Sequence, residues 1–313
     1  MLENNVLITG GAGYIGSILT KTLLDNNFKV TILDNFRYEQ NSLLEYCTNK
    51  NFSIIKGDCR EQETLSHALK DKNFIIHLAA IVGAPLCDKE PTTAKTTNFD
   101  AAKLLLSLRT IDQKILFPCT NSGYGIGERN KYCTEESALN PISLYAKTKV
   151  DAERAILDSK NSISFRLATV FGVSPRMRLD LLVNDFVYKA MKDKKIILFE
   201  SHFKRNYLHI RDVARVFLHG INNFSKMKNQ VYNVGLSNAN LSKLELCQTI
   251  KKFIPDFTFE ESPIGKDPDK RDYIVSNEKI EKTGFMPEHT LEMGILELMK
   301  SYPMLNNSKF SNI

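Results

Sequence analysis

The stretch VLITGGAGYIG, residues 6–16, joins a short apolar run to the expected first turn of a helix. Its glycines follow the pattern G-x-x-G-x-x-G, which allows a tight turn, close approach of the backbone to a pyrophosphate and close helix–strand packing. The N-terminus of such a helix offers free N–H groups to phosphates. A glycine-rich turn without a ligand is the alternative, but the position directly after a strand favours a dinucleotide site. The residues expected to bind the dinucleotide here are Gly10, Gly13, Tyr14, Ile15 and Gly16.

Asp34 ends the second expected strand and follows Gly16 at a distance typical of such sites. An acid at this place hydrogen-bonds the adenosine ribose hydroxyls and repels a 2′-phosphate. Arg37 lies close by and could accept that phosphate. Because Asp34 is present, we expect NAD rather than NADP as the cofactor.

Short β-branched runs alternate with helical patterns through the first half of the chain. The near-continuous apolar character of these runs indicates strands buried on both faces, as in a parallel sheet. The expected strands are 6–9, 28–33, 52–56, 74–78, 114–118 and 162–166, and the expected helices are 15–26, 64–69, 93–109 and 143–159. This alternation predicts an α/β fold, a Rossmann-type doubly wound parallel sheet with right-handed crossovers.

The alternation breaks beyond Gly172. Further elements are expected at 183–192, 207–221, 231–234, 243–253 and 291–300, of which 207–221 and 231–234 should return to the main sheet. We therefore predict an NAD-binding domain of residues 1–172 plus 205–235. A smaller, discontinuous substrate domain would take residues 173–204 plus 236–313, with fraying expected at 306–313.

Composition excludes several classes of protein. Hydrophobic residues make up 42% and charged residues 25% of the 313 residues, which is ordinary globular usage. No run of 18 apolar residues occurs, and the first residues lack a basic segment, so neither a membrane span nor a signal peptide is expected. The six cysteines never form C-x-x-C, which favours free, buried thiols in a reducing cytoplasm and no metal site. The net charge of +6 is scattered, so nucleic-acid binding is not expected.

The pattern Tyr-x-x-x-Lys occurs three times, at Tyr46/Lys50, Tyr145/Lys149 and Tyr188/Lys192. Only the second pair opens a helix that follows the long loop after the fifth strand. That place lies at the carboxyl edge of the sheet, where ligands of open α/β folds bind. Tyr145 and Lys149 are therefore the candidate catalytic pair, and the other two pairs are interpreted as packing or surface residues.

The chemistry of this pair follows from proton affinities. A tyrosine has a pKa near 10, which is too high for a base at neutral pH. A lysine one helical turn away, together with a positively charged nicotinamide, favours the phenolate, which can accept a hydroxyl proton as hydride leaves the same carbon. Thr120 and Ser122, after the fifth strand, could hydrogen-bond the reacting oxygen. For Ser122, ordinary turn chemistry is an equal alternative.

Taken together, these residues resemble the extended short-chain dehydrogenase/reductases, in their nucleotide-sugar epimerase/dehydratase group, along essentially the whole chain. The motifs that carry the resemblance are TGGAGYIG (9–16), Asp34-Asn35, Gly57-Asp58, HLAA (77–80), Asn98, Thr120, Tyr124-Gly125, Tyr145/Lys149, Arg166, RNYLHIRD (205–212), YNVG (232–235) and Arg271. The resemblance implies catalysis by Thr120, Tyr145 and Lys149. It also implies that the dinucleotide contacts Asn35, Asp58, Cys59, Leu78, Ala79, Ala80 and Asn98.

The same resemblance implies a nucleotide-sugar substrate whose diphosphate is held by Arg205 and Arg271. Further expected substrate contacts are Asn121, Ser122, Thr169, Arg176 and Arg178. Arg176 and Arg178 could meet a phosphate or the far end of the sugar, or one of them could only cap a helix. A GDP-activated heptose is the favoured substrate on resemblance alone.

Departures from the family pattern narrow the expected reaction. The 4,6-dehydratases carry Asp-Glu directly after the catalytic threonine, whereas this chain has Asn121-Ser122, which cannot eliminate water. Thr169 stands where 4-epimerases often have an asparagine. Oxidation at C-4 of the sugar is therefore predicted, with a UDP-sugar 4-epimerase as the alternative. A non-catalytic dinucleotide-binding sensor or scaffold is the alternative of another class.

The leucines of residues 104–108 lie on more than one side of their expected helix, so one stripe needs a cover beyond the sheet. Pairing of this helix and the Tyr145 helix across a two-fold axis would provide it, as the family implies. A homodimer is predicted, and a helix wholly buried within one subunit is the alternative.

Overall fold

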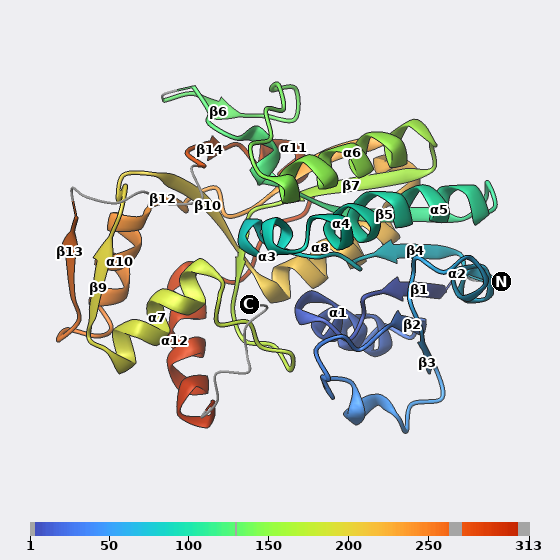
Figure 1. Cartoon of the computed structure of the whole chain (residues 1–313), viewed down its shortest axis with the longest axis horizontal. Coiled ribbons are helices and arrows are strands. Elements are labelled where there is room, and N and C mark those ends of the chain that lie inside the picture. Colours follow the sequence, from blue (N-terminus) through green and yellow to red (C-terminus); the bar gives the residue numbers. More distant parts are fainter. Residues whose placement is uncertain (1–3, 129, 263–270, 306–313) are drawn as a thin grey trace.

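A seven-stranded parallel sheet forms the centre of the protein (Figure 1). The computed structural model describes residues 4–128, 130–262 and 271–305. The strand order is β11-β7-β5-β4-β1-β2-β3. The strands are β1 (Asn5–Thr9), β2 (Lys29–Asp34), β3 (Phe52–Lys56), β4 (Phe74–His77), β5 (Lys114–Thr120), β7 (Ser162–Leu167) and β11 (Gln230–Val234). All six neighbouring pairs run parallel, which confirms the Rossmann-type fold.

The predicted burial of both faces is found for the inner strands but not for the edge strand β3. β4 and β7 are buried at every residue, as their apolar runs predicted. β3 is different, because none of its five residues is buried. It pairs only with β2 in the sheet, so its apolar run marks an edge strand rather than a central one.

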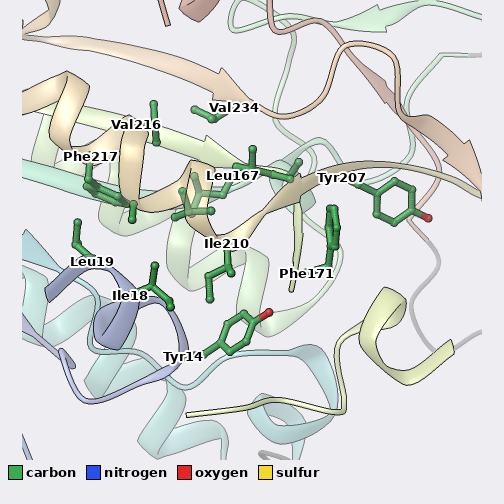
Figure 2. Close-up of a cluster of buried hydrophobic side chains, with 14 of the residues drawn as sticks. Tyr14, Ile18, Leu19, Leu167, Phe171, Tyr207, Ile210, Val216, Phe217 and Val234 are labelled. Carbon is green, nitrogen blue, oxygen red and sulfur yellow. The ribbon is translucent and has the colours of Figure 1, made fainter. Parts of the chain in front are cut away.

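Helices cover both faces of the sheet. One face packs against α1 (Tyr14–Asp25) and α8 (Ile210–Asn222), whose side chains meet those of the strands in the core drawn in Figure 2. The other face packs against α2 (Gln62–Leu69), α5 (Ala101–Leu108) and α6 (Leu144–Asp158). Alternate residues of β1 divide between the two cores, because successive strand side chains point to opposite faces.

The helix expected over residues 93–109 is not one regular α-helix. It consists of α4 (Pro91–Lys95), a π-helical turn (Thr96–Asp100) and α5. The π turn carries Asn98, which is 1% exposed and donates from Nδ2 to the carbonyl of Ile81 at 2.9 Å. Nearby, α3 (Ala84–Lys89) was not anticipated from the sequence.

The second part of the protein is built from short sheets and three longer helices (Figure 1). The small sheets are β12-β10-β8, β13-β9 and β14-β6. Their strands are β6 (Tyr132–Cys133), β8 (Thr169–Phe171), β9 (Lys195–Leu198), β10 (Lys204–His209), β12 (Asn240–Ser242), β13 (Thr258–Glu261) and β14 (Ile274–Val275). The longer helices are α7 (Leu182–Lys192), α10 (Lys243–Lys251) and α12 (Leu291–Ser301), and the short ones are α9 (Phe224–Met227) and α11 (Glu278–Glu281).

The expectation that 207–221 returns to the main sheet is corrected by this arrangement. β10, which contains Tyr207, pairs with β8 and β12 outside the main sheet, and only α8 and β11 return. β10 is buried from its second residue onward, but this burial arises from packing against α8 and α12 and the strands of the small sheets. Periodicity alone cannot tell which sheet a buried strand joins.

Other expectations concern cysteines and membrane spans. Five of the six cysteines are buried free thiols, whereas Cys47 is exposed. Within residues 4–128, 130–262 and 271–305, the structure has no helix whose length and apolar character would suffice to cross a membrane. The fraying expected at 306–313 lies outside the described residues.

Candidate active site

A cavity of about 680 Å³ lies at the carboxyl ends of the main strands, between the sheet and the second part of the protein. Its wall takes in the β1–α1 turn, the ends of β2, β4 and β5, the first turns of α6, the segment after β8 and residues of β10 and α10. Nearly all the expected site residues lie on this one wall, including the three catalytic candidates. Asn98 and Asn121 are the exceptions among them.

The β1–α1 turn is shaped by contacts that only glycine permits. Gly10 has φ +70°, and a Cβ there would lie 2.7 Å from the backbone of Ala79. A Cβ at Gly16 would lie 2.5 Å from the Cα of Gly11. No side chain caps the N-terminus of α1, so no side chain accepts a hydrogen bond from the first backbone N–H groups of this helix. These features fit a pyrophosphate, as the sequence predicted.

Asp34 is held firmly at the end of β2. Its carboxylate accepts from the backbone N–H groups of Ala12 at 3.0 Å and of Phe36 at 2.8 Å. Burial raises its pKa above the ordinary value despite these hydrogen bonds. Arg37, the residue that could have favoured a 2′-phosphate, forms a salt bridge with Glu90. The arrangement therefore fits the ribose hydroxyls of NAD.

Asp58 and Cys59 also line this end of the cavity. Asp58 forms a salt bridge with Arg60 at 2.6 Å, and the hydrogen bond from Arg60 lowers the pKa of its carboxyl group. Cys59 is buried, and burial raises the pKa of its thiol to about 12. Cys59 therefore stays a neutral thiol that contributes packing rather than charge.

Asn98 and Asn121 stand behind the wall instead of on it. Asn98 accepts from the backbone N–H of Ile81 at 2.7 Å and donates back to its carbonyl. It therefore holds the loop after β4 at the cavity, and its expected contact with the cofactor stays a prediction. Asn121 is 1% exposed and is not among the residues that line the cavity, and its expected contact with the substrate stays a prediction.

The catalytic candidates meet where β5 ends and α6 begins. Ser143 caps α6 by accepting from the N–H of Ala146, and this places Tyr145 in the first turn and Lys149 one turn later. Thr120 donates to Ser122 Oγ at 2.9 Å and accepts from the Ser122 N–H at 3.1 Å. Two hydroxyls and a phenol are thereby gathered on one part of the wall.

Burial opposes the charged form of both members of the Tyr145/Lys149 pair. Burial raises the pKa of Tyr145 well above its ordinary value. Burial also lowers the pKa of Lys149 to about 8, and its Nζ lies 3.9 Å from the centre of the Phe117 ring. Within the protein's own residues Tyr145 is therefore a neutral phenol. Forming a phenolate would take the added positive charge of an oxidised nicotinamide.

Three further basic side chains line the cavity. Arg205, on β10, is 3% exposed and stands over the Tyr273 ring at 5.9 Å. Arg271 donates to Ser122 Oγ, which brings it beside the catalytic hydroxyls. Lys243, at the first turn of α10, was missed in the sequence. The capping box Ser242–Glu245 marks the start of that helix, but nothing in it signals a cavity.

The remaining expected residues come from the segment after β8. Thr169 opens β8 and lines the cavity. Arg178 pairs with Asp180 at 2.5 Å. Arg176 stands over the ring of Tyr38, a residue of the loop after β2 that the sequence did not single out.

Lys149→Met should stabilise the fold at neutral pH while abolishing activity. Lys149 gives up its proton near pH 8 in the folded state but near 10.5 when unfolded, so its buried charge costs stability at pH 7. We expect the variant to be more stable by on the order of 2 kcal/mol at pH 7. Between pH 8 and 10.5 the unfolded wild type binds more protons, so wild-type stability should rise toward that of the variant. Urea unfolding at several pH values measures this, and a difference that does not change with pH would contradict it.

Comparison with known proteins agrees with the geometry. A family model described as "NAD dependent epimerase/dehydratase family" matches residues 6–235. The chain is 26% identical to the low-salt glycan biosynthesis protein Agl12 of Haloferax volcanii, over 93% of this chain and 96% of that protein.

Solved structures share the fold at lower identity. A UDP-glucuronic acid 4-epimerase of Bacillus cereus has a TM-score of 0.86 at 22% identity, covering 96% of this chain and 99% of its own. A dTDP-glucose 4,6-dehydratase of Bacillus anthracis has a TM-score of 0.84 at 24% identity, with 98% of each chain covered. The family match, together with the cavity, carries the assignment: this chain belongs to the NAD dependent epimerase/dehydratase family and is an enzyme that uses NAD.

Proposed function

We propose that this enzyme oxidises C-4 of a nucleotide-activated sugar to a ketone. The observation that carries the proposal is the layout of one cavity. The dinucleotide turn, Asp34, the catalytic hydroxyls and the basic residues Arg205, Lys243 and Arg271 all line this one cavity, and Arg271 donates to Ser122 Oγ beside Thr120. A sugar with a hydroxyl at Tyr145 and a diphosphate at the arginines would span this space, since guanidinium forks suit phosphate oxygens.

Each catalytic side chain has a separate task in the proposed reaction. Tyr145 removes the proton of the 4-hydroxyl as the C–H electron pair leaves that carbon as hydride. Thr120 orients the hydroxyl, and its own geometry is fixed by Ser122. Lys149 holds the nicotinamide ribose and favours the phenolate by its charge. NAD, when bound, supplies the hydride acceptor.

The residues after Thr120 argue against dehydration. Elimination of water needs an acid and a base beside the sugar, whereas Asn121 is an amide that lies off the wall and Ser122 is a neutral hydroxyl. The second candidate reaction is a 4-epimerase, because the same tyrosine, lysine and threonine would make the same ketone and then return hydride to its opposite face.

For the substrate we propose GDP-D-glycero-D-manno-heptose. The support for guanine and for the heptose is the sequence resemblance alone, because base recognition uses groups in variable loops. A UDP-sugar is the competing choice. The cavity supports the shared part of both, a nucleoside diphosphate held by Arg205 and Arg271.

We also propose a homodimer built on α5 and α6. In α5, Leu105 is fully buried, whereas Leu104, Leu106 and Leu108 remain partly exposed on the subunit. Partly exposed leucines beside a second helix are suited to an isologous contact across a two-fold axis.

Tyr145→Phe should abolish ketone formation and leave NAD binding intact, because it removes only the group that accepts the proton. The assay is product analysis after incubation of the purified protein with candidate nucleotide sugars. A 4-keto product in wild type supports the dehydrogenase, and an epimer supports the alternative. Full turnover by the variant would contradict both reactions.

Thermal-shift measurements with GDP, UDP, dTDP and CDP test the base. A nucleotide present at about 100 times its dissociation constant should add roughly 2.7 kcal/mol of stability. We expect GDP to raise the melting temperature most, and a larger shift with UDP would replace the heptose proposal by the UDP-sugar 4-epimerase. Arg205→Ala should weaken all four nucleotides together, since that residue is proposed to meet the diphosphate.

The dimer is tested by sedimentation at micromolar concentration. We expect twice the mass of 35.6 kDa, and Leu106→Glu together with Leu108→Glu should yield monomers by placing charges in the apolar contact. A monomeric wild type would contradict the proposal.

A further inference from the structure

Arg176 is a buried arginine on the wall of the active-site cavity. Its side chain is 6% exposed, and its Nη1 donates to the carbonyl of Met177 at 2.9 Å. The guanidinium lies over the ring of Tyr38, 4.4 Å from the ring centre. Arg176 therefore bridges from the segment after β8 to the loop after β2, across the cofactor end of the cavity.

Within the part of the chain that the structure describes, Arg176 forms no salt bridge, and Asp180, whose charge raises its pKa, is paired with Arg178. Its neighbour Arg178 has Asp180 at 2.5 Å, whereas no carboxylate there comes within 4 Å of Arg176. Burial and the charge of Arg178 both lower the pKa of Arg176. A buried cation without an anion is costly, and one that also borders a cavity is suited to an anionic ligand.

The position of Arg176 is fixed relative to the dinucleotide turn. Two residues earlier, Ser174 donates to the carbonyl of Tyr14 at 2.7 Å and meets Ser17 at 2.9 Å. Tyr14 in turn donates from its hydroxyl to the carbonyl of Gly172 at 2.6 Å. The segment that carries Arg176 is therefore fastened to the first turn of α1.

Tyr38 belongs to a loop that is fastened to the same turn. Ser42, four residues after Tyr38, donates to the carbonyl of Ala12 at 2.7 Å. Both members of the Arg176–Tyr38 stack thus arise from segments tied to the glycine turn. The N-terminus of α1 within that turn has no side-chain cap.

We propose that Arg176 binds the pyrophosphate of NAD, not the substrate. The helix end would supply N–H groups and a partial positive charge to this anion, and Arg176 would add a full charge. Tyr38 holds the plane of the guanidinium in place. The diphosphate of the substrate is left to Arg205, Lys243 and Arg271, so the two anions have separate cationic partners.

Binding measurements with fragments of the cofactor test this assignment without any turnover. In Arg176→Gln we expect the dissociation constants of NADH and of ADP-ribose to rise about 10- to 100-fold, as for a lost charge-assisted hydrogen bond. Adenosine, which carries no phosphate, should bind as it does to wild type. Fluorescence of bound NADH, with ADP-ribose and adenosine as competitors, provides the constants. Arg176→Lys should recover part of the loss, because it keeps the charge but not the planar stack.

Matched controls separate the possible outcomes. Lys195→Gln removes the same charge from exposed β9 and should change none of these constants. If Arg176→Gln weakens UDP and GDP while leaving ADP-ribose unchanged, Arg176 belongs to the substrate and the proposal is overturned. If adenosine weakens as much as ADP-ribose, the residue acts only by supporting the Tyr38 loop, which also overturns it. Unfolding curves confirm that each variant is folded.

Discussion

The close approach of backbone to backbone at the glycine turn is the constraint on which the rest of the site depends. Gly10 lies against Ala79 and Gly16 lies against Gly11 at separations that exclude any side chain. Because the chain turns this tightly, α1 starts directly beneath the end of β1 and leaves its N–H groups at the sheet's carboxyl edge. The N-terminus of α1, the carboxylate of Asp34 and the start of α6 can then face one cavity.

Two polar contacts fix neighbouring segments of the site relative to the sheet. The hydroxyl of Tyr14 joins α1 to Gly172, directly after β8 of the second part of the protein. On the other face of the sheet, Arg166 of β7 pairs with Glu153 of α6 at 2.8 Å, and both are buried. Because a broken buried pair would leave an unpaired charge, α6 is held in one position, and with it Tyr145. The site is therefore positioned from both faces of the sheet.

The seven strands of the main sheet could be predicted because each is a short apolar run between turn residues. Position within the sheet could not, as the exposed edge strand β3 and the misassigned β10 show. Tyr145 was distinguishable from Tyr46 and Tyr188 because topology alone brings its helix to the ligand edge. The contact of Arg176 with Tyr38 could not be predicted, because the two residues are 138 positions apart and lie in separate loops. For Asn98, the structure adds hydrogen bonds to Ile81 that the motif did not indicate.

The charges on the cavity wall explain why binding and catalysis are coupled here. Basic side chains on the described wall outnumber acidic ones by eight to five, and burial opposes the charge of both Lys149 and Arg176. NAD and nucleotide sugars are both anions, so their binding would offset the desolvation cost of these buried positive charges. Tyr145 is affected in the opposite sense, because burial favours its neutral form. In the proposed mechanism, the positive charge of oxidised NAD would favour loss of the phenol proton, so the base would form in the complex with the cofactor.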